Sequence, residues 1–390
     1  MGRLRVVHII TMLELGGAQQ NTLYTVAHLN RSLFVVALIS GPGGILDDEA
    51  RRLPDLSVQF CAELARPVRP LADFQAYQQL RQMLREMKPD IVHTHSSKAG
   101  ILGRLAASSE NVPVILHTYH GFGFHRHQNA GVFKLYTALE REACRRCRHL
   151  IFVSQNNREW AEQLGLIQNC SVSLIRSGVE IEPLLKAKRS DAFRAQLGIE
   201  GREKAVGMIA CLKPQKDPLT FVEAADIVTR KNSKVKFFLF GDGELAKAVE
   251  ERSTRMRHHQ VFQHAGWRRD IPEILANLDL VVLPSLWEGL PRVIPEATIA
   301  GVPVIASDVD GNREIIFEGQ NGALAEPRNP EDFAEKILQA LEKHWTVDPE
   351  LSRRIQHEFD IREMVRRQET LYLELASALN RENATSGVVG

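Results

Sequence analysis

A chain of 390 residues is longer than a single hydrophobic core usually becomes, so roughly two domains are expected. Hydrophobic residues make up 44% and charged residues 25%, which are ordinary values for a globular protein. The 49 Lys and Arg against 48 Asp and Glu leave a formal net charge of +1, which argues against a dedicated nucleic-acid binder. No apolar run approaches the roughly 18 residues of a membrane span, so we expect any membrane contact to be peripheral.

The cysteines and the first residues favour a reducing, cytoplasmic location. The 5 cysteines are too few and too scattered for a disulfide framework. Cys144 and Cys147 form a C-x-x-C in an Arg-rich helical stretch, but no second pair lies nearby, so we interpret them as ordinary thiols. Arg3 and Arg5 precede a short apolar run that contains His8 and lacks a cleavage site, which indicates a buried strand rather than a signal peptide.

Short apolar strand patterns alternate with helical patterns, which is typical of parallel strands joined by helical crossovers. In the first half, the expected strands are 5–11, 34–40, 57–62, 90–95, 113–119 and 149–154, with helices such as 18–29 and 74–87 between them. In the second half, they are 205–211, 234–240, 259–265, 278–284 and 302–308. The predicted fold class is therefore α/β, with two Rossmann-like halves.

The alternation pauses near residues 176–188, which we interpret as the join between the domains and as a hinge. We expect an N-terminal domain at 1–180, completed by a C-terminal helix at about 360–380, and a C-terminal domain at 181–359. Residues 381–390 are small and polar and are predicted to be a disordered tail.

The most informative stretch is residues 283–316. A strand ends at Pro284, a loop carries Glu288, and a helix is expected to begin near Pro291. Ligands of parallel sheets bind beyond the carboxyl ends of the strands, where helix N-termini favour anions. Glu288 is therefore expected at the mouth of a phosphate site, and Glu296 could accept hydrogen bonds from ribose hydroxyls.

Glu288 and Glu296 are the two ends of the motif EGLPRVIPE, an E-x7-E that is followed by AGVPVIASD and GNRE. The segments GGAQQ, HTHSSKAGILGRLAA, HTYHGF, LKPQKDP and FGDGEL precede it, in that order. This ordered set covers nearly the whole chain and resembles the retaining glycosyltransferases of family 4. The resemblance implies the GT-B fold, in which two Rossmann-like domains face each other across a cleft.

The resemblance also implies a donor, a nucleoside diphosphate sugar of the UDP or GDP type, and a set of site residues. Glu288 would contact the transferred sugar, Lys216 would neutralise the leaving diphosphate, and His120 would lie near the reacting sugar, which makes these three the catalytic candidates. Glu296 would bind the donor ribose. The other donor-binding candidates are Gly16, Gly17, Lys213, Gly241, Gly243, Gly289 and Leu290.

We expect neither a metal ion nor another cofactor. Without a metal, the charge that develops on a diphosphate must be stabilised by lysine, arginine and helix N-termini. Family members often carry an arginine five residues before the lysine that corresponds to Lys216, but Cys211 stands there, so Lys213 could supply the second cation. The D-V-D at 308–310 imitates a metal-binding D-x-D, but we interpret it as a loop and N-cap signal that leads into Gly311.

Histidines crowd the expected ends of the fourth and fifth strands: His93, His95, His117, His120, His125 and His127. The H-x-H at 93 and 95 would place both rings on one face of a strand, but a catalytic zinc site needs a third protein ligand. We expect most of these side chains to line the acceptor cleft or to be satisfied core residues, with metal binding as the minor alternative.

Two further patterns have alternative interpretations. Residues 241–246 match the dinucleotide fingerprint but follow the second strand of their half, so the glycines are expected to let the backbone approach the donor nucleotide. A basic stretch with apolar residues in it is either a helix with a solvated edge or a docking face for anionic lipid or a lipid-pyrophosphate acceptor. It consists of Val132, Phe133, Lys134, Leu135, Leu139, Arg141, Arg145, Arg146 and Arg148.

The leading hypothesis is a metal-independent, retaining glycosyltransferase that moves a sugar from a nucleoside diphosphate sugar to a hydroxyl of a sugar or lipid-linked sugar. The family's commonest setting is bacterial polysaccharide or glycolipid assembly, in the cytoplasm or at the inner face of the membrane, with no nucleic-acid partner. The alternatives are a sugar-nucleotide epimerase or hydrolase on the same scaffold, a non-catalytic nucleotide-sugar-binding protein, and an NAD-dependent oxidoreductase, which lacks a well-placed fingerprint.

Overall fold

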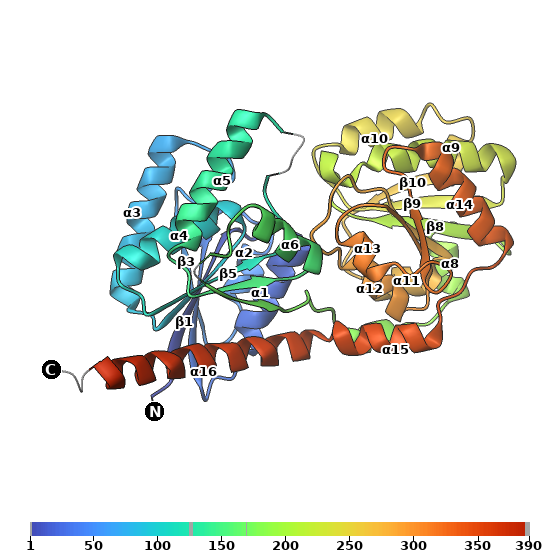
Figure 1. Ribbon diagram of the computed structural model, residues 1–390. Helices are drawn as coiled ribbons and strands as arrows, with labels where there is room; N and C mark the ends of the chain where they lie inside the picture. The colour runs from blue at the N-terminus through green and yellow to red at the C-terminus, as the bar shows by residue number, and fades with distance from the viewer. Residues whose placement is uncertain (1, 125–127, 169, 387–390) are drawn as a thin grey trace. The chain divides into compact units, whose positions relative to one another are not determined.

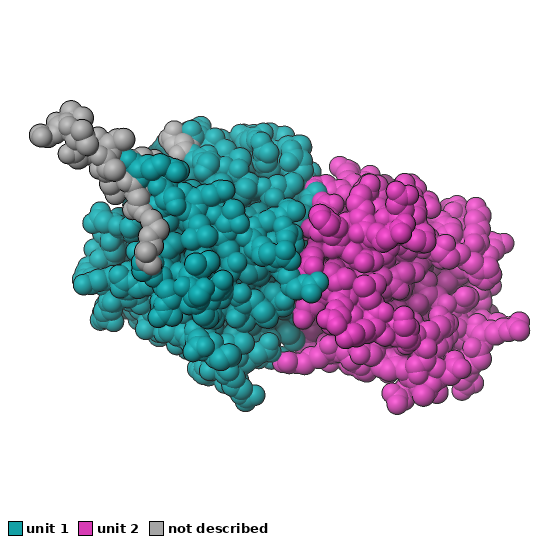
Figure 2. All heavy atoms as spheres, turned by 90° about the horizontal axis from the view of Figure 1, so that it is seen from below, with its two compact units in different colours: residues 1–178, 361–390 teal, residues 179–360 magenta. Residues whose placement is uncertain are grey.

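A computed structural model describes residues 2–124, 128–168 and 170–386. The chain forms two compact units, unit 1 with residues 1–178 and 361–390 and unit 2 with residues 179–360 (Figures 1 and 2). The chain therefore leaves unit 1 after Gly178 and re-enters it at Ile361. A hydrogen bond of 2.8 Å from Val179 N to Phe359 O joins the two ends of unit 2.

Unit 1 contains a parallel sheet with the strand order β3-β2-β1-β4-β5-β6-β7. Its strands are β1 Leu4–Met12, β2 Phe34–Gly41, β3 Leu56–Phe60, β4 Ile91–His95, β5 Val114–Tyr119, β6 His149–Phe152 and β7 Ser171–Leu174. Its helices are α1 Gly17–His28, α2 Asp47–Arg51, α3 Pro70–Met87, α4 Ser97–Ser109, α5 Ala130–Cys144, α6 Gln155–Gln163 and α16 Ile361–Ser386.

Strand β1 is buried on both faces, as expected for the centre of a parallel sheet. Val6 and Ile10 pack in one core with side chains of α1 and α16, whereas Val7 and Ile9 pack in a second core with side chains of α3 and α4. The last helix of the chain therefore covers the same face of the sheet as the first helix (Figure 1).

Unit 2 repeats the design with the parallel strand order β10-β9-β8-β11-β12-β13. Its strands are β8 Lys204–Ile209, β9 Val235–Phe240, β10 Phe262–Gly266, β11 Leu280–Leu283, β12 Val304–Ser307 and β13 Gly322–Ala325. Its helices are α7 Ile181–Lys186, α8 Asp191–Gln196, η1 Pro214–Lys216, α9 Pro218–Lys231, α10 Ala246–Ser253, η2 His259–Val261, α11 Ile271–Asn277, α12 Val293–Ile299, α13 Asn312–Ile315, α14 Pro330–Glu342 and α15 Pro349–Glu358.

The α/β class with two parallel sheets is confirmed, and the differences from the sequence prediction lie at edges and ends. The edge strands β7 and β13 were not predicted, because four residues each, SVSL and GALA, give too short a pattern. The strand expected from residue 259 begins at Phe262, after a short 3-10 helix. The predicted disordered tail was wrong for residues 381–386, which continue α16, while 387–390 lie outside the described residues.

Membrane-spanning helices were also not expected. Within the described ranges, no helix combines the length and the apolar character that crossing a bilayer requires.

The C-x-x-C pair is buried in unit 1, and burial raises the pKa of Cys147 to about 12 and that of Cys144 above its ordinary value. Thiols with raised pKa values are poor nucleophiles, which agrees with their interpretation as ordinary core residues.

A buried ion pair fastens α4 to α5 in unit 1. The Arg104 guanidinium is fully buried and donates to Glu140 Oε2 at 2.5 Å and to Gly100 O at 2.7 Å. Tyr119 OH donates to the same carboxylate oxygen at 2.7 Å. Because every member has partners, the desolvation of the two charges is offset as long as the set is complete.

We therefore expect Arg104→Met to lower the free energy of unfolding by about 3–5 kcal/mol, since it leaves the Glu140 carboxylate buried without its cation. Urea unfolding followed by circular dichroism would measure this loss. The double variant Arg104→Met with Glu140→Leu should recover most of it, because neither charge is then left alone. Equal losses in the single and double variants would contradict this account.

Candidate functional site

The strand order of unit 2 reverses next to its first strand, β8, which has β9 on one side and β11 on the other. The loops that follow β8 and β11 therefore leave the same edge of the sheet as neighbours, at the place where ligands of open α/β sheets bind. Lys216 is in the first loop, at the end of η1, and Glu288 is in the second. This topology brings together two of the predicted catalytic residues.

The two loops are joined by direct contacts. Lys216 Nζ donates to Glu288 Oε1, and the Glu288 side chain is only 5% exposed. Leu286 N donates to Gln215 O at 2.8 Å, and Gln215 Nε2 donates to Trp287 O at 2.9 Å. Gln215 was not among the predicted site residues, but its position next to Lys216 makes it the residue that holds the Glu288 loop in place.

A third loop, after β12, supports the same segment. Glu288 N donates to Asp310 Oδ2 at 3.1 Å. A Cβ atom on Gly311 would lie 2.1 Å from Gly289 O, so the close approach of these two loops requires a glycine at 311. Gly289 and Leu290 are both buried.

The interpretation of residues 308–310 as an N-cap signal was wrong in part. The N-cap of α13 is Gly311, with no side-chain cap. Asp308 instead pairs with Arg313 Nε at 2.6 Å, and Asp310 adopts a positive φ of 33° and faces the Glu288 loop.

Gly241 and Gly243, in the loop after β9, have φ values of +141° and +154°, which disfavour any side chain. A Cβ at these positions would lie 1.8 Å from Ala210 O and 2.6 Å from Leu212 O, respectively. The glycines therefore let this loop rest on the loop after β8. Lys213 follows Leu212 and is the N-cap residue of η1.

Glu296 lies in α12, which begins at Val293, two residues after Pro291 and so close to the predicted start. Its carboxylate pairs with Arg292 Nη2 at 3.3 Å. Burial raises the pKa of Glu296, the Arg292 charge opposes this rise, and the Glu180 charge adds to it. The group is therefore easier to protonate than an ordinary glutamate.

Two serines that the sequence analysis missed follow the same strands. Ser285 lies just beyond β11, and Ser307 ends β12. Their hydroxyl oxygens are buried and have no hydrogen-bond partner among the described residues. Buried hydroxyls usually have partners, so both are free to serve a ligand or a water. A serine directly after a buried strand is the signal that could have identified them.

The predicted site residues do not all lie in one unit. Gly16 is the N-cap of α1 and Gly17 is the first residue of this helix, so both belong to unit 1. The φ of Gly16, −175°, is extended backbone that any residue adopts. His120 follows β5 in the same unit. The other candidates, from Lys213 to Glu296, belong to unit 2.

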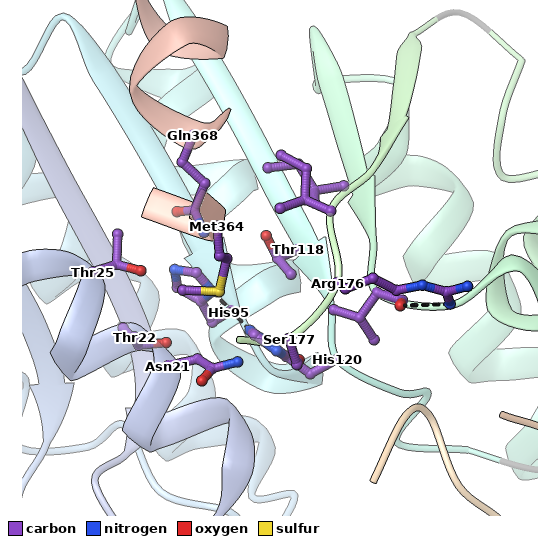
Figure 3. Close-up of a pocket in the computed structure, with 13 residues that line it drawn as sticks. Asn21, Thr22, Thr25, His95, Thr118, His120, Arg176, Ser177, Met364 and Gln368 are labelled. Carbon is purple, nitrogen blue, oxygen red and sulfur yellow. Dashed lines mark hydrogen bonds between the residues drawn. The ribbon is translucent and has the colours of Figure 1, made fainter. Parts of the chain in front are cut away.

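Three histidines of unit 1 form a hydrogen-bonded series, of which Figure 3 shows His95 and His120. His8 Nδ1 and His95 Nε2 are 3.0 Å apart, and His95 Nδ1 and His120 Nε2 are 3.1 Å apart. His120 Nδ1 is buried and has no partner within the described part of the chain. It lies at a pocket of about 10 Å³, lined among others by Asn21, Ser177 and His95.

The series continues to the last helix. Tyr372 OH of α16 lies 3.3 Å from His8 Nε2 and 2.6 Å from His93 Nδ1, and His93 Nε2 lies 2.7 Å from Thr118 Oγ1. The H-x-H prediction that His93 and His95 share a face is confirmed by ring centroids 4.2 Å apart. His8 is the third histidine that a metal site at His93 and His95 lacked in the sequence, since ligand nitrogens of the three residues lie within 4.8 Å of one another. In the structure, these nitrogens bond to one another and to Tyr372 and Thr118.

Burial keeps these rings neutral. Desolvation lowers the pKa of His8 to about 3 and of His120 to about 4, and it lowers the pKa values of His93, His95 and His117 well below the usual range. His117 faces the other side of the sheet, where Nδ1 bonds to Thr94 Oγ1 at 2.9 Å. The predicted candidates His125 and His127 lie outside the described residues.

The basic stretch is less free than the sequence suggests. Arg145 and Arg146 both pair with Glu142, and Arg141 Nε donates to Leu164 O at 2.8 Å. The apolar side chains of α5 are instead exposed: Val132 by 44%, Leu135 by 59% and Leu139 by 40%. Any docking face on α5 would therefore make contact through its apolar side chains more than through its charged ones.

Two family models together match most of the chain. One, described as glycosyl transferases group 1, matches residues 189–358, and the other, glycosyltransferase family 4, matches residues 15–183. The UDP-Gal:alpha-D-GlcNAc-diphosphoundecaprenol alpha-1,3-galactosyltransferase of Escherichia coli is 33% identical over 87% of this chain and 88% of its own length. The N,N'-diacetylbacillosaminyl-diphospho-undecaprenol alpha-1,3-N-acetylgalactosaminyltransferase of Campylobacter jejuni is 27% identical over 76% and 80%, respectively. Among solved structures, HepE of Anabaena in complex with UDP-glucose superposes with a TM-score of 0.80 at 21% identity over 95% of this chain and 100% of that one.

The buried neutral histidines predict acid sensitivity. In the unfolded chain, histidines bind protons below their ordinary pKa of about 6.5. In the folded protein, the rings of His8, His93, His95 and His117 stay neutral. The free energy of unfolding therefore falls as the pH falls from about 6.5 toward the lowered pKa values. We expect a loss of about 1.4 kcal/mol per pH unit for each such histidine. Thermal midpoints between pH 7 and pH 5 would measure it. The exposed-site variant His28→Gln should keep the wild-type slope, and a wild-type midpoint that is flat across this range would refute the prediction.

Proposed function

Since the chain belongs to the family 4 glycosyltransferases, we propose that it transfers a sugar from a UDP-sugar to a hydroxyl of a sugar carried on a polyprenyl diphosphate, with retention of configuration. Its two parallel-sheet units are the Rossmann-like domains of the GT-B fold. The donor and acceptor classes are supported by the E. coli relative, and the acceptor class also by the C. jejuni relative, whose names both specify a diphosphoundecaprenol-linked sugar.

The observation that carries the donor assignment is the pairing of Lys216 with Glu288 beside the strand reversal of unit 2. A diphosphate leaves readily only if its developing negative charge is stabilised. Lys216 would supply that charge when the donor displaces Glu288 from it, and Glu288 would then be available to the hydroxyls of the transferred sugar. Lys213 would provide a second cation, and the glycine-lined backbone at 241, 243 and 289–290 would approach the nucleotide.

Glu296 would hold the ribose of the donor, because an ionised carboxylate can accept hydrogen bonds from two hydroxyls. Its raised pKa gives donor binding a pH dependence. The protonated form binds the ribose less well, so affinity rises as the pH rises through the raised pKa of Glu296.

In unit 1, His120 would contact the reacting sugar, and Gly16 and Gly17 would let the start of α1 approach the ligand. We assign no metal ion to the reaction, because the lysines and backbone groups named above can meet the charge of the diphosphate. The leaving phosphate oxygen can itself take the proton of the acceptor hydroxyl, so no separate base is required.

A screen of purified protein against UDP, UDP-sugars, GDP, GDP-sugars and NAD(H), with and without EDTA, tests the donor assignment. We expect only the uridine compounds to raise the thermal midpoint, by mass action, and EDTA to leave the rise unchanged. Lys216→Ala should lower kcat by about 10²–10³ fold, as loss of a charge-stabilising group does. Glu296→Ala should instead raise the KM for the donor about tenfold, because the variant loses the charged group that accepts hydrogen bonds from the ribose hydroxyls.

The matched control is Lys247→Ala, which removes an exposed lysine of α10 in the same unit. It should keep wild-type kinetics. Release of an altered sugar without any acceptor would support an epimerase or hydrolase instead. Binding of UDP without turnover of any polyprenyl diphosphate sugar would support a non-catalytic binder, and a shift with NAD(H) alone would support an oxidoreductase.

We also propose that unit 1 contacts an anionic membrane surface, where a polyprenyl acceptor resides. Exposed apolar side chains gather at the start of α3, with Val68 61%, Leu71 83% and Phe74 60% exposed, and add to those of α5. Helix α4 packs against both α3 and α5. A surface groove of about 370 Å³ is lined by Asp73, Phe74 and Tyr77 of α3 and by Arg146. Apolar anchors beside basic groups are typical of interfacial binding.

The double variant Leu71→Ser with Phe74→Ser should weaken binding to vesicles that contain phosphatidylglycerol by at least about tenfold, because two buried anchors are worth roughly 1.5–3 kcal/mol each. Vesicle co-sedimentation measures this. Leu185→Ser, an equally apolar and 45% exposed site in unit 2, is the control and should bind like the wild type. A wild type that does not sediment, or a double variant that still does, would remove the proposal.

A further inference from the structure

We propose that His120 offers Nδ1 as a hydrogen-bond acceptor for one substrate hydroxyl, and that Tyr372 of α16, acting through His8 and His95, fixes this tautomer. Tyr372, His8 and His95 are then positioning residues. The identity of the substrate rests on the proposed function, but the tautomer of His120 does not.

The argument begins with the number of protons. A neutral imidazole has one N–H, so in a series of bonded rings each ring donates at one nitrogen and accepts at the other. His8, His95 and His120 are bonded in order at 3.0 and 3.1 Å, so the direction chosen at one end is transmitted to the other. The direction at Tyr372 therefore determines which nitrogen of His120 carries the proton.

The direction at Tyr372 follows from its three contacts. Its hydroxyl has one proton, and its bond to His93 Nδ1 at 2.6 Å is much shorter than its contacts with His8 Nε2 at 3.3 Å and Gln368 Oε1 at 3.5 Å. A phenol is a stronger acid than a neutral imidazole N–H, and an imidazole nitrogen is a stronger acceptor than a phenol oxygen, so the short bond is Tyr372 O–H donating to His93. His93 Nε2 then donates to Thr118 Oγ1.

The rest of the series follows by elimination. Because Tyr372 has used its proton, His8 Nε2 donates to the phenol oxygen and His8 Nδ1 accepts from His95 Nε2. His95 Nδ1 accepts in turn from His120 Nε2. His120 Nδ1 is left with a lone pair, and it is this nitrogen that has no partner among the described residues.

The surroundings keep every ring in its neutral form. Arg31 lies close enough to His8, and Arg104 to His117, to oppose a positive charge on these rings. His93, His95, His117 and His120 oppose one another in the same way, and His149 acts on His93. Burial raises the pKa of the Tyr372 phenol, and the charge of Glu369 adds to this rise, so this group also stays protonated. Arg176 lines the pocket at His120.

The pocket determines what can reach Nδ1. Its volume of about 10 Å³ is at the lower limit for one water molecule, so a ligand enters it with a single hydroxyl and not with a sugar ring. Asn21, Thr22 and Ser177 complete its polar wall (Figure 3). The lone pair of His120 Nδ1 in this wall therefore favours a ligand hydroxyl that can donate a hydrogen bond.

The test is a long-range ¹H–¹⁵N spectrum of the full-length protein labelled with [¹⁵N]histidine, which distinguishes protonated from unprotonated ring nitrogens. We expect His120 to be protonated at Nε2 and unprotonated at Nδ1, with the signals assigned by their absence in His120→Gln. In Tyr372→Phe the direction is no longer fixed, so the His120 signals should become a mixture of both tautomers.

The kinetic counterpart uses the same variant. Tyr372→Phe should lower kcat at least about fivefold and leave the donor KM unchanged, while His28→Gln, which removes an exposed histidine of α1 outside the series, should keep the wild-type kcat. Protonation of His120 at Nδ1 in the wild type, which needs no variant to fold, would overturn the proposal. So would a Tyr372→Phe protein with an unchanged His120 tautomer. If the tautomer is as expected but no sugar is transferred, only the proposed function fails.

Discussion

Parallel strands can be joined only by crossovers, so every loop that follows a strand leaves the sheet at the same edge. Where the strand order reverses, two such loops become neighbours although they are far apart in sequence, as Lys216 and Glu288 are. Three loops, after β8, β11 and β12, then support one another through Gln215, Asp310 and the close approach of Gly289 and Gly311. The candidate donor site is thus a consequence of topology, and hydrogen bonds of both backbone and side-chain groups hold its loops together.

The two units solve the problem of buried polar groups in opposite ways. Unit 2 places charged partners together at its candidate site, with Lys216 against Glu288 and Arg292 against Glu296. Unit 1 keeps the histidines of its candidate site uncharged, because desolvation holds the rings neutral and hydrogen bonds satisfy all but one of the nitrogens in the series from His8 to His120. Charges suit the binding of a diphosphate, whereas neutral acceptors suit the selection of hydroxyls. The proposed division of donor and acceptor between the units agrees with this contrast.

The strands in the middle of each sheet could be predicted because they are buried on both faces and read as continuous apolar runs. The edge strands β7 and β13 could not, since SVSL and GALA have too little apolar side chain to stand out from a loop. Glu288, Glu296 and Lys216 were found through their motifs and loop positions, although their roles are still proposals. His8, Tyr372 and Asp310 were missed because their importance comes from contacts between distant segments, such as the 364 positions between His8 and Tyr372, and no local pattern records them.

The return of α16 to unit 1 affects how the chain folds as it is synthesised. Residues 179–360 form a contiguous unit that can fold as soon as it emerges, whereas the core of unit 1 includes Met364, Val365 and Tyr372. The ribosome supplies these side chains last, so the domain that begins the chain is completed after the one inserted into it. Until then, α16 is missing from the face of the sheet that it shares with α1, and Tyr372 is absent from the end of the histidine series. The nascent protein would therefore complete its proposed donor-binding unit before its proposed acceptor-binding unit, and a chain interrupted shortly before residue 361 would carry the first without the second.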